Sequence, residues 1–204
     1  MHERYEYRTI RIERAAWPTV AAAVYGSVAD AVREAGGVMF GLWRGEIGWW
    51  SDEGAVITAW SDEPRHELLD GIPGVIDARV ERVRATVRPV EPSPPSMDGV
   101  YAHRWFEFAP DDWDEFVDLS QGAWPDFEGA HDGTTVVGLF RGVDDPSRAL
   151  LLTRYPSLAM WEQSRPYNPN AKEGLEQARA RFLRRAELTE RTGVVVSRLV
   201  TAPA

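Results

Sequence analysis

One histidine stands where acid–base chemistry is plausible. His103 lies in the middle of an aromatic segment, 101–108, whose alternating residues predict a β-strand. Tyr101 and Trp105 are two positions away on either side, so the three side chains are expected on one face of the sheet. A neutral imidazole can exchange a proton near pH 7 or ligate a haem iron. The alternative is an interior histidine that only makes hydrogen bonds.

Two arginines are candidates for binding the anionic part of a ligand. Arg104 and Arg141 each lie in a predicted strand, and a guanidinium can hold a carboxylate or stabilise a developing oxyanion. Each also recurs in the first half of the chain, as Arg8 and Arg44. A residue shared by two copies equally suits a structural duty such as an ion pair.

Aromatic residues are abundant, with nine Trp, six Tyr and seven Phe. Such side chains can line an apolar pocket or simply fill a core. Trp124 and Tyr155 are the ones we expect in a binding site. The wider set of candidate wall residues is Trp124, Phe127, Phe140, Tyr155 and Trp161.

Glu128 and His131 form a Glu-x-x-His pair, a spacing used by carboxylate-bridged metal centres. Such centres need a second copy, but the aligned residues of the first half are Ala31 and Glu34. The chain has four histidines and no cysteine, so no metal site is expected.

Composition and missing motifs exclude several functional classes. The net charge is −9, which disfavours nucleic acid and anionic membranes as partners. The absence of cysteine excludes disulfides and thiol nucleophiles. No phosphate-binding glycine loop and no Gly-x-Ser-x-Gly elbow occurs. The N-terminal segment lacks an apolar signal core, so a cytoplasmic location is expected.

The strands and helices that must position these residues occur twice in the sequence. Several blocks recur in the same order at a spacing of 95–97 residues, which indicates a tandem duplication. The matched blocks are Tyr5 with Tyr101, Arg8 with Arg104, Trp17 with Trp113, 41–45 with 138–142, and 55–60 with 150–155.

A proline-rich segment, 89–98, separates the two copies and reads as an extended spacer. The expected domains are therefore 1–88 and 99–204, the second with an inserted helix over 171–187 after the loop 166–170. The arginines of that helix alternate with glutamates, which favours a solvated face with internal ion pairs.

The pattern of each copy predicts the element order strand, helix, strand, strand, helix, strand. The long helix of the second copy is expected to break near Gly122 and restart at Pro125, and the later helices to begin near Pro64 and Ser157. The closing strands are expected over 83–88 and 194–200. This order is the ferredoxin-like βαββαβ unit, an α+β fold with one bare sheet face.

Two such bare faces can cover each other within one chain. We therefore expect an intramolecular α+β barrel of eight strands, a pseudo-dimer, whose lumen has room for side chains and at most one small ligand. We expect the ligand site in this lumen.

Both copies resemble the dimeric α+β barrel superfamily and, within it, the NIPSNAP type. The resemblance covers nearly the whole chain apart from the spacer and the inserted helix. It is carried by 5–12, 40–43 and 46–48 in the first copy and by 124–128, 138–141 and 153–155 in the second. It implies the fold, and a range of activities that includes cofactor-free monooxygenases, haem-binding proteins and isomerases.

Three functional hypotheses follow. The first is a protein that binds a small apolar or aromatic molecule, with cofactor-independent oxygenation or isomerisation by His103 as base and Arg104 or Arg141 near the oxyanion; whether it is an enzyme stays open. The second is a haem-binding protein with His103 or His131 as axial ligand. The third is a non-enzymatic interaction protein with a solid lumen. A homodimer of the pseudo-dimer is a further expectation.

Overall fold

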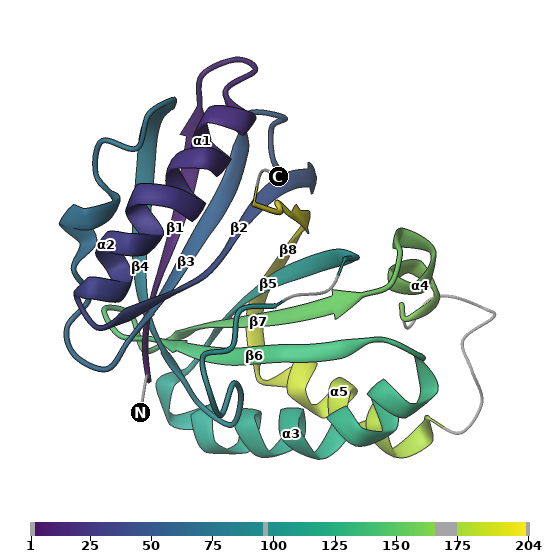
Figure 1. Ribbon diagram of the computed structural model, residues 1–204. Helices are drawn as coiled ribbons and strands as arrows, with labels where there is room; N and C mark the ends of the chain where they lie inside the picture. The colour runs from purple at the N-terminus through teal and green to yellow at the C-terminus, as the bar shows by residue number, and fades with distance from the viewer. Residues whose placement is uncertain (1–2, 96–97, 166–174, 203–204) are drawn as a thin grey trace.

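A computed structural model describes residues 3–95, 98–165 and 175–202 and shows a mixed α+β fold. Eight antiparallel strands close into a barrel in the order β1-β3-β2-β8-β5-β7-β6-β4, with helices on its outer side (Figure 1). The strands are β1 (Arg4–Ile12), β2 (Gly37–Ile47), β3 (Glu53–Trp60), β4 (Val75–Ala85), β5 (Val100–Phe108), β6 (Thr135–Gly142), β7 (Arg148–Tyr155) and β8 (Thr189–Leu199).

The barrel consists of two four-stranded halves that meet along two seams. The first half has the order β4-β1-β3-β2 and the second β8-β5-β7-β6. One seam joins β2 to β8 and the other joins β4 to β6. Beyond the end of β4, Thr86 donates to the Leu139 carbonyl and Leu139 donates to the Arg88 carbonyl, which lengthens the second seam. The expected α+β architecture with an eight-stranded antiparallel sheet is confirmed.

The long helices of the two halves differ in continuity. In the first half, α1 (Trp17–Ala23) continues through a π-helical turn, Val24–Val28, into α2 (Ala29–Glu34), and the rod is kinked at Gly26. In the second half, α3 (Trp113–Ala130) continues without interruption through Pro125, so the predicted break near Gly122 is wrong. Buried residues on both sides of Pro125 hold α3 against the sheet, which offsets the single backbone hydrogen bond that proline removes.

The later helices also differ from the expected ones. Where a helix was expected from Pro64, the first half has only a 3₁₀ turn, His66–Leu69. In the second half, α4 (Leu158–Gln163) begins after Ser157, whose hydroxyl accepts a hydrogen bond from the Met160 amide. It is followed by α5 (Glu176–Glu187); the expected loop 166–170 and the expected helical residues 171–174 lie outside the described residues.

Two strands are longer than the sequence indicated. The expected segments 83–88 and 194–200 correspond to β4, which starts at Val75, and β8, which starts at Thr189. The first residues of β8 are polar, and the first part of β4 mixes apolar with charged residues, so a hydrophobicity pattern does not reveal their extended conformation. Among the described residues, no helix is long and apolar enough to cross a membrane.

The barrel interior is filled by side chains, most of them aromatic. Tyr5 contacts the rings of Phe40 and Phe140, with centroids 5.5 and 4.9 Å away, and Trp43 contacts Tyr101 at 5.7 Å. These residues form one buried cluster with aliphatic residues of β3 and β7. The interior is therefore the principal core of the molecule.

Two glycines explain why a Gly-Leu-aromatic motif occurs in both halves. Gly41 and Gly138 each lie where the register of a strand pair shifts. A Cβ at these positions would lie 2.6 Å from the Trp43 ring and 2.5 Å from the Phe140 ring, respectively. Glycine thus leaves space for the aromatic ring two residues later to fold over the strand into the barrel.

Candidate functional site

The strand that carries the predicted site, β5, directs Tyr101, His103 and Trp105 into the barrel interior. Tyr101 belongs to the interior cluster and Trp105 packs against it. His103 is 0% exposed and lies between the rings of Trp43 and Trp49, with centroid distances of 5.6 and 5.3 Å. The three side chains share one sheet face, as their alternate spacing predicts.

Both ring nitrogens of His103 have protein partners. Nδ1 lies 2.9 Å from the Tyr7 hydroxyl, and Nε2 lies 2.7 Å from Ser197 Oγ. Ser197 donates to the Tyr101 carbonyl, so its oxygen accepts from Nε2–H, and Nδ1 accepts from Tyr7. Burial lowers the pKa of His103 to about 3 and raises the pKa of Tyr7.

This environment gives His103 a structural role. Its ring is neutral, sealed and fully hydrogen-bonded, and neither of the two cavities described below includes it among its lining residues. The expectation of a ligand in the lumen is wrong, because aromatic side chains occupy that space.

Arg104 lies on the opposite face of β5 from His103. Consecutive residues of a strand point to opposite sides, so Arg104, with Ala102 and Phe106, faces the helices outside the barrel. The expected pairing of His103 as base with Arg104 at an oxyanion is therefore wrong. Arg141 is also outside: its guanidinium stacks on Trp113 at 4.8 Å and donates to the carbonyl of Pro146.

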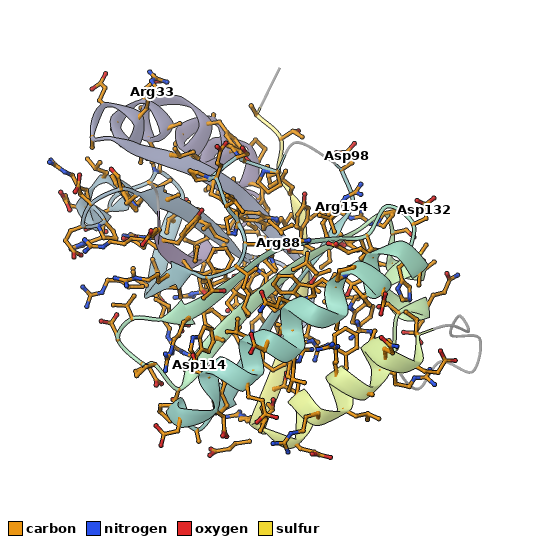
Figure 2. The ribbon with its side chains drawn as sticks, turned by 90° about the horizontal axis from the view of Figure 1, so that it is seen from below. Arg33, Arg88, Asp98, Asp114, Asp132 and Arg154 are labelled. Atoms are coloured by element: carbon orange, nitrogen blue, oxygen red, sulfur yellow. The ribbon has the colours of Figure 1, made fainter. Side chains whose placement is uncertain are left out.

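A cavity of about 400 Å³ lies between the outer sheet face of the second half and its two long helices. In Figure 1 these helices, α3 and α5, lie below β5–β8, and Figure 2 shows them side by side from below. The walls are largely apolar and come from β5, β7, α3 and α5. Among the lining residues are Ala102, Phe106, Trp124, Phe127, Tyr155 and Phe182.

The cavity thus brings together three of the expected binding residues, Arg104, Trp124 and Tyr155. Phe127 joins them, whereas Phe140 points into the barrel and Trp161 packs beside Tyr155 in a neighbouring cluster. The buried indole N–H of Trp124 has no hydrogen-bond partner within the described part of the chain.

Sequence reasoning missed Arg185, the most unusual residue of the cavity. It lies on α5, one residue after Arg184, which forms ion pairs with Glu115 and Glu187 on the outer side. Arg185 instead turns inward, and its guanidinium carbon lies 5.0 Å from the ring centre of Phe106 and 4.9 Å from that of Phe182.

Within the described part of the chain, the Arg185 guanidinium makes one side-chain hydrogen bond, to Ser120 Oγ at 3.1 Å. Ser120 in turn donates to the Phe116 carbonyl. Burial, and then the charge of Arg104, lower the pKa of Arg185 to about 10. Helical periodicity could have suggested an inward position for Arg185, but the interleaved glutamates made all the arginines look solvated.

The matching region of the first half is closed by ion pairs. Arg8, at the position equivalent to Arg104, is buried and donates to Glu6 Oε1 at 2.9 Å and to Asp70 Oδ1 at 2.8 Å. It also donates to the His66 carbonyl at 2.8 Å. Arg8 thus has a structural role, with partners inside its own half.

Glu128 has a structural role, whereas His131 lies at the cavity. Glu128 Oε1 accepts hydrogen bonds from Arg88 and from the Val136 amide, each at 2.7 Å; Arg88 is labelled in Figure 2. His131 is buried, lines the cavity and places Nδ1 2.8 Å from the Phe127 carbonyl oxygen. No group of three or more metal-ligating side chains is found among the residues that the structure describes.

A second hollow, of about 530 Å³, lies at one end of the barrel and is mostly polar. Three of its charged residues, Arg79, Glu107 and Arg148, take part in ion pairs. Arg148 forms an ion pair with Glu81, stacks on Trp105 at 4.7 Å and lies 3.9 Å from Glu107. This hollow is therefore a solvated ion-pair cluster.

The sequence matches no protein-family model and no curated protein. Its fold is similar to that of several solved structures. A candidate monooxygenase from Fusobacterium nucleatum has a TM-score of 0.66 at 8% identity, over 98% of this chain and 93% of that chain. A candidate monooxygenase from Lactobacillus acidophilus has a TM-score of 0.64 at 13% identity, over 98% and 94%.

A haem-binding protein from Thermus thermophilus has a TM-score of 0.56 at 13% identity, over 99% of this chain and 93% of that chain. At such identities the similarity concerns the fold. The chain thus shares the α+β barrel architecture of these proteins.

Proposed function

We propose that the protein binds a small, largely apolar or aromatic molecule in the cavity between the outer sheet face of β5–β8 and helices α3 and α5. The supporting observation is the cavity itself. Its volume of about 400 Å³ falls within the range of roughly 300–1,000 Å³ typical of small-molecule sites, and its walls are mainly apolar. The three structural neighbours include candidate oxygenases and a haem-binding protein, which agrees with a ligand-binding barrel.

A second part of the proposal concerns how the two halves of the chain arose. We infer a tandem duplication of a ferredoxin-like unit, related to the NIPSNAP type, in which the second copy opened a cavity that the first copy fills with ion pairs. The support is the order of repeated positions and the contact between one such pair, Tyr7 and His103. Catalysis by His103 is not part of the proposal, because its ring is sealed in the barrel.

Filling the cavity tests the proposal. Ala102 is buried in the cavity wall on β5, so Ala102→Phe places a ring in the proposed ligand space. We expect this variant to fold and to lose binding of the probes 2-naphthoate and 2-naphthalenemethanol by more than tenfold, measured by calorimetry. Val80→Phe, on the exposed side of β4, is the matched control and should bind as the wild type does. Equal binding by both variants contradicts the proposal.

Haem is a second candidate ligand, favoured by His131. This residue lines the cavity, and its Nδ1 lies at hydrogen-bond distance from a backbone carbonyl, as in many metal-ligating histidines. The donor chemistry of the site therefore fits an axial imidazole, and bound haem would supply redox-active iron. The Phe127 carbonyl would orient the His131 imidazole through Nδ1, while the apolar walls would exclude water.

A haemin titration tests this candidate. We expect a shifted Soret band with the wild type that is lost in His131→Ala and kept in His66→Ala, a matched control because His66 is exposed on the first half. A spectrum unchanged by His131→Ala contradicts the role of this residue.

A further inference from the structure

We propose that the natural ligand of the cavity is an organic carboxylate with an apolar body, and that Arg185 binds its carboxylate group beside Arg104. This inference rests on the proposed function and names the class of molecule. The cavity wall presents positive charge to the interior of the cavity, and this charge is the first observation in its support.

Arg185 presents a cation without a matching anion. In the described part of the chain no carboxylate lies within 4.0 Å of its guanidinium, and its one hydrogen bond goes to a neutral hydroxyl. Three phenylalanine rings surround it, with the ring centre of Phe116 at 5.6 Å from the guanidinium carbon as the third. Arg185 is partly buried, and a charge partly withdrawn from water without an opposite charge is costly, so this arrangement indicates a site kept ready for an anion.

Arg104 adds a second positive charge to the same wall. Arg104 and Arg185 both line the cavity, and the charge of Arg104 contributes to the lowered pKa of Arg185. Like charges that line one cavity repel, and an anion bound in the cavity reduces this repulsion. Glu190 also lines the cavity, but it is exposed and has no ion pair among the described residues.

The corresponding wall of the first half is closed by an ion pair. There Arg8 is neutralised by Glu6, two positions before it on the same strand face. The position equivalent to Glu6 in the second half is Ala102, which has no charge and lines the cavity. At this position the second half therefore has free space in place of an internal carboxylate. The carboxylate of a ligand can occupy that space.

A guanidinium suits this task because its planar donors can bind both oxygens of a carboxylate. Phe106 and Phe182, two of the rings that contact Arg185, also provide an apolar wall for the remainder of the ligand. The expected molecule therefore has one acidic end and an aromatic or aliphatic body.

The test compares acids with neutral molecules of the same skeleton. The probes are 2-naphthoate against 2-naphthalenemethanol and decanoate against 1-decanol, measured by calorimetry on the full-length protein. A hydrogen bond to a charged group corresponds to about a tenfold to hundredfold difference in affinity, so the acids should bind tighter by that factor. Arg185→Met, which keeps an unbranched side chain, should abolish the preference for the acids over the neutral probes.

Arg184→Met is the matched control, since it removes the same charge from the outer side of the same helix. It should keep the preference for acids. Arg185→Lys keeps the charge and should retain part of the preference, which serves if the methionine variant fails to fold. Equal binding of acid and neutral probes overturns the inference but leaves the proposed function standing. Binding of no probe overturns both, and an equal loss in Arg184→Met and Arg185→Met overturns the inference alone.

Discussion

At the scale of single residues, two nitrogen-rich side chains differ in how their polar atoms are satisfied: His103 is fully buried, and Arg185 is partly buried. His103 stays neutral, and hydroxyl groups of Tyr7 and Ser197 satisfy its two nitrogens. Arg185 stays charged and rests on aromatic rings, with one hydroxyl as partner. The protein satisfies both ring nitrogens of His103, whereas the Arg185 guanidinium has N–H donors left for a ligand.

His103 makes folding stability depend on pH. Its pKa is about 3 in the folded protein and about 6.5 when unfolded. Between these values the unfolded chain binds a proton that the folded one does not, so the free energy of unfolding falls as pH decreases below about 6.5. The slope from this group approaches about 1.4 kcal/mol per pH unit.

We therefore expect His103→Gln to be less stable than the wild type at pH 7.5 by about 1–3 kcal/mol, because buried hydroxyl partners lose hydrogen bonds. The difference should shrink as pH falls from 6.5 to 4.5, since the variant lacks the titrating ring. Urea unfolding across this pH range measures it. If the free energies of unfolding of the two proteins changed with pH in the same way, the assignment of His103 as a neutral, sealed side chain would be contradicted.

At the scale of elements, close approach between neighbouring strands decides where glycine is required. Gly54 on β3 pairs with Arg44 on β2. A Cβ at Gly54 would lie 2.1 Å from the Trp43 carbonyl oxygen and 2.6 Å from the ring of Trp17, so both the strand pair and the start of α1 restrict this position. Gly193 on β8, by contrast, has no atom within 4 Å of such a Cβ.

This contrast predicts unequal effects of the same substitution. Gly54→Ala should destabilise the protein by about 1–3 kcal/mol through overpacking, which lowers Tm by about 2–4 °C per kcal/mol in a chain of this size. Gly193→Ala, as the control, should be neutral or slightly stabilising. Thermal unfolding followed by circular dichroism measures both, and equal Tm values would contradict the packing of β2 against β3.

At the scale of the whole molecule, one core belongs to both halves. The interior cluster combines Tyr5, Tyr7 and Phe40 from the first half with Tyr101 and Phe140 from the second. The two seams, β2–β8 and β4–β6, close the sheet around it. Neither half can bury its inner face without the other.

We therefore expect the fragments 1–88 and 99–204 to be unstable when separate. Each exposes an aromatic sheet face and two strand edges, so each alone should unfold without cooperativity or associate. Mixing them should restore one cooperative transition and a one-to-one complex, checked by circular dichroism and size-exclusion chromatography. Two fragments that each unfold cooperatively as monomers would contradict a shared core.

The sequence alone determined the features that depend on local periodicity. Alternation along 101–108 placed Tyr101, His103 and Trp105 on one face, and the repeated blocks indicated the order of strands and the mixed α+β class. These predictions succeed because strand parity and chain order are properties of neighbouring residues.

Only the tertiary structure decided which side of the sheet holds empty space. The barrel interior is solid because large side chains from opposite halves, such as Tyr7 and Trp105, meet across it at 5.4 Å. The cavity lies outside because α5 packs beside α3 and turns Arg185 inward while Arg184 faces Glu115. Free volume and charge compensation depend on distances between segments far apart in the chain, and residue periodicity contains no information about those distances.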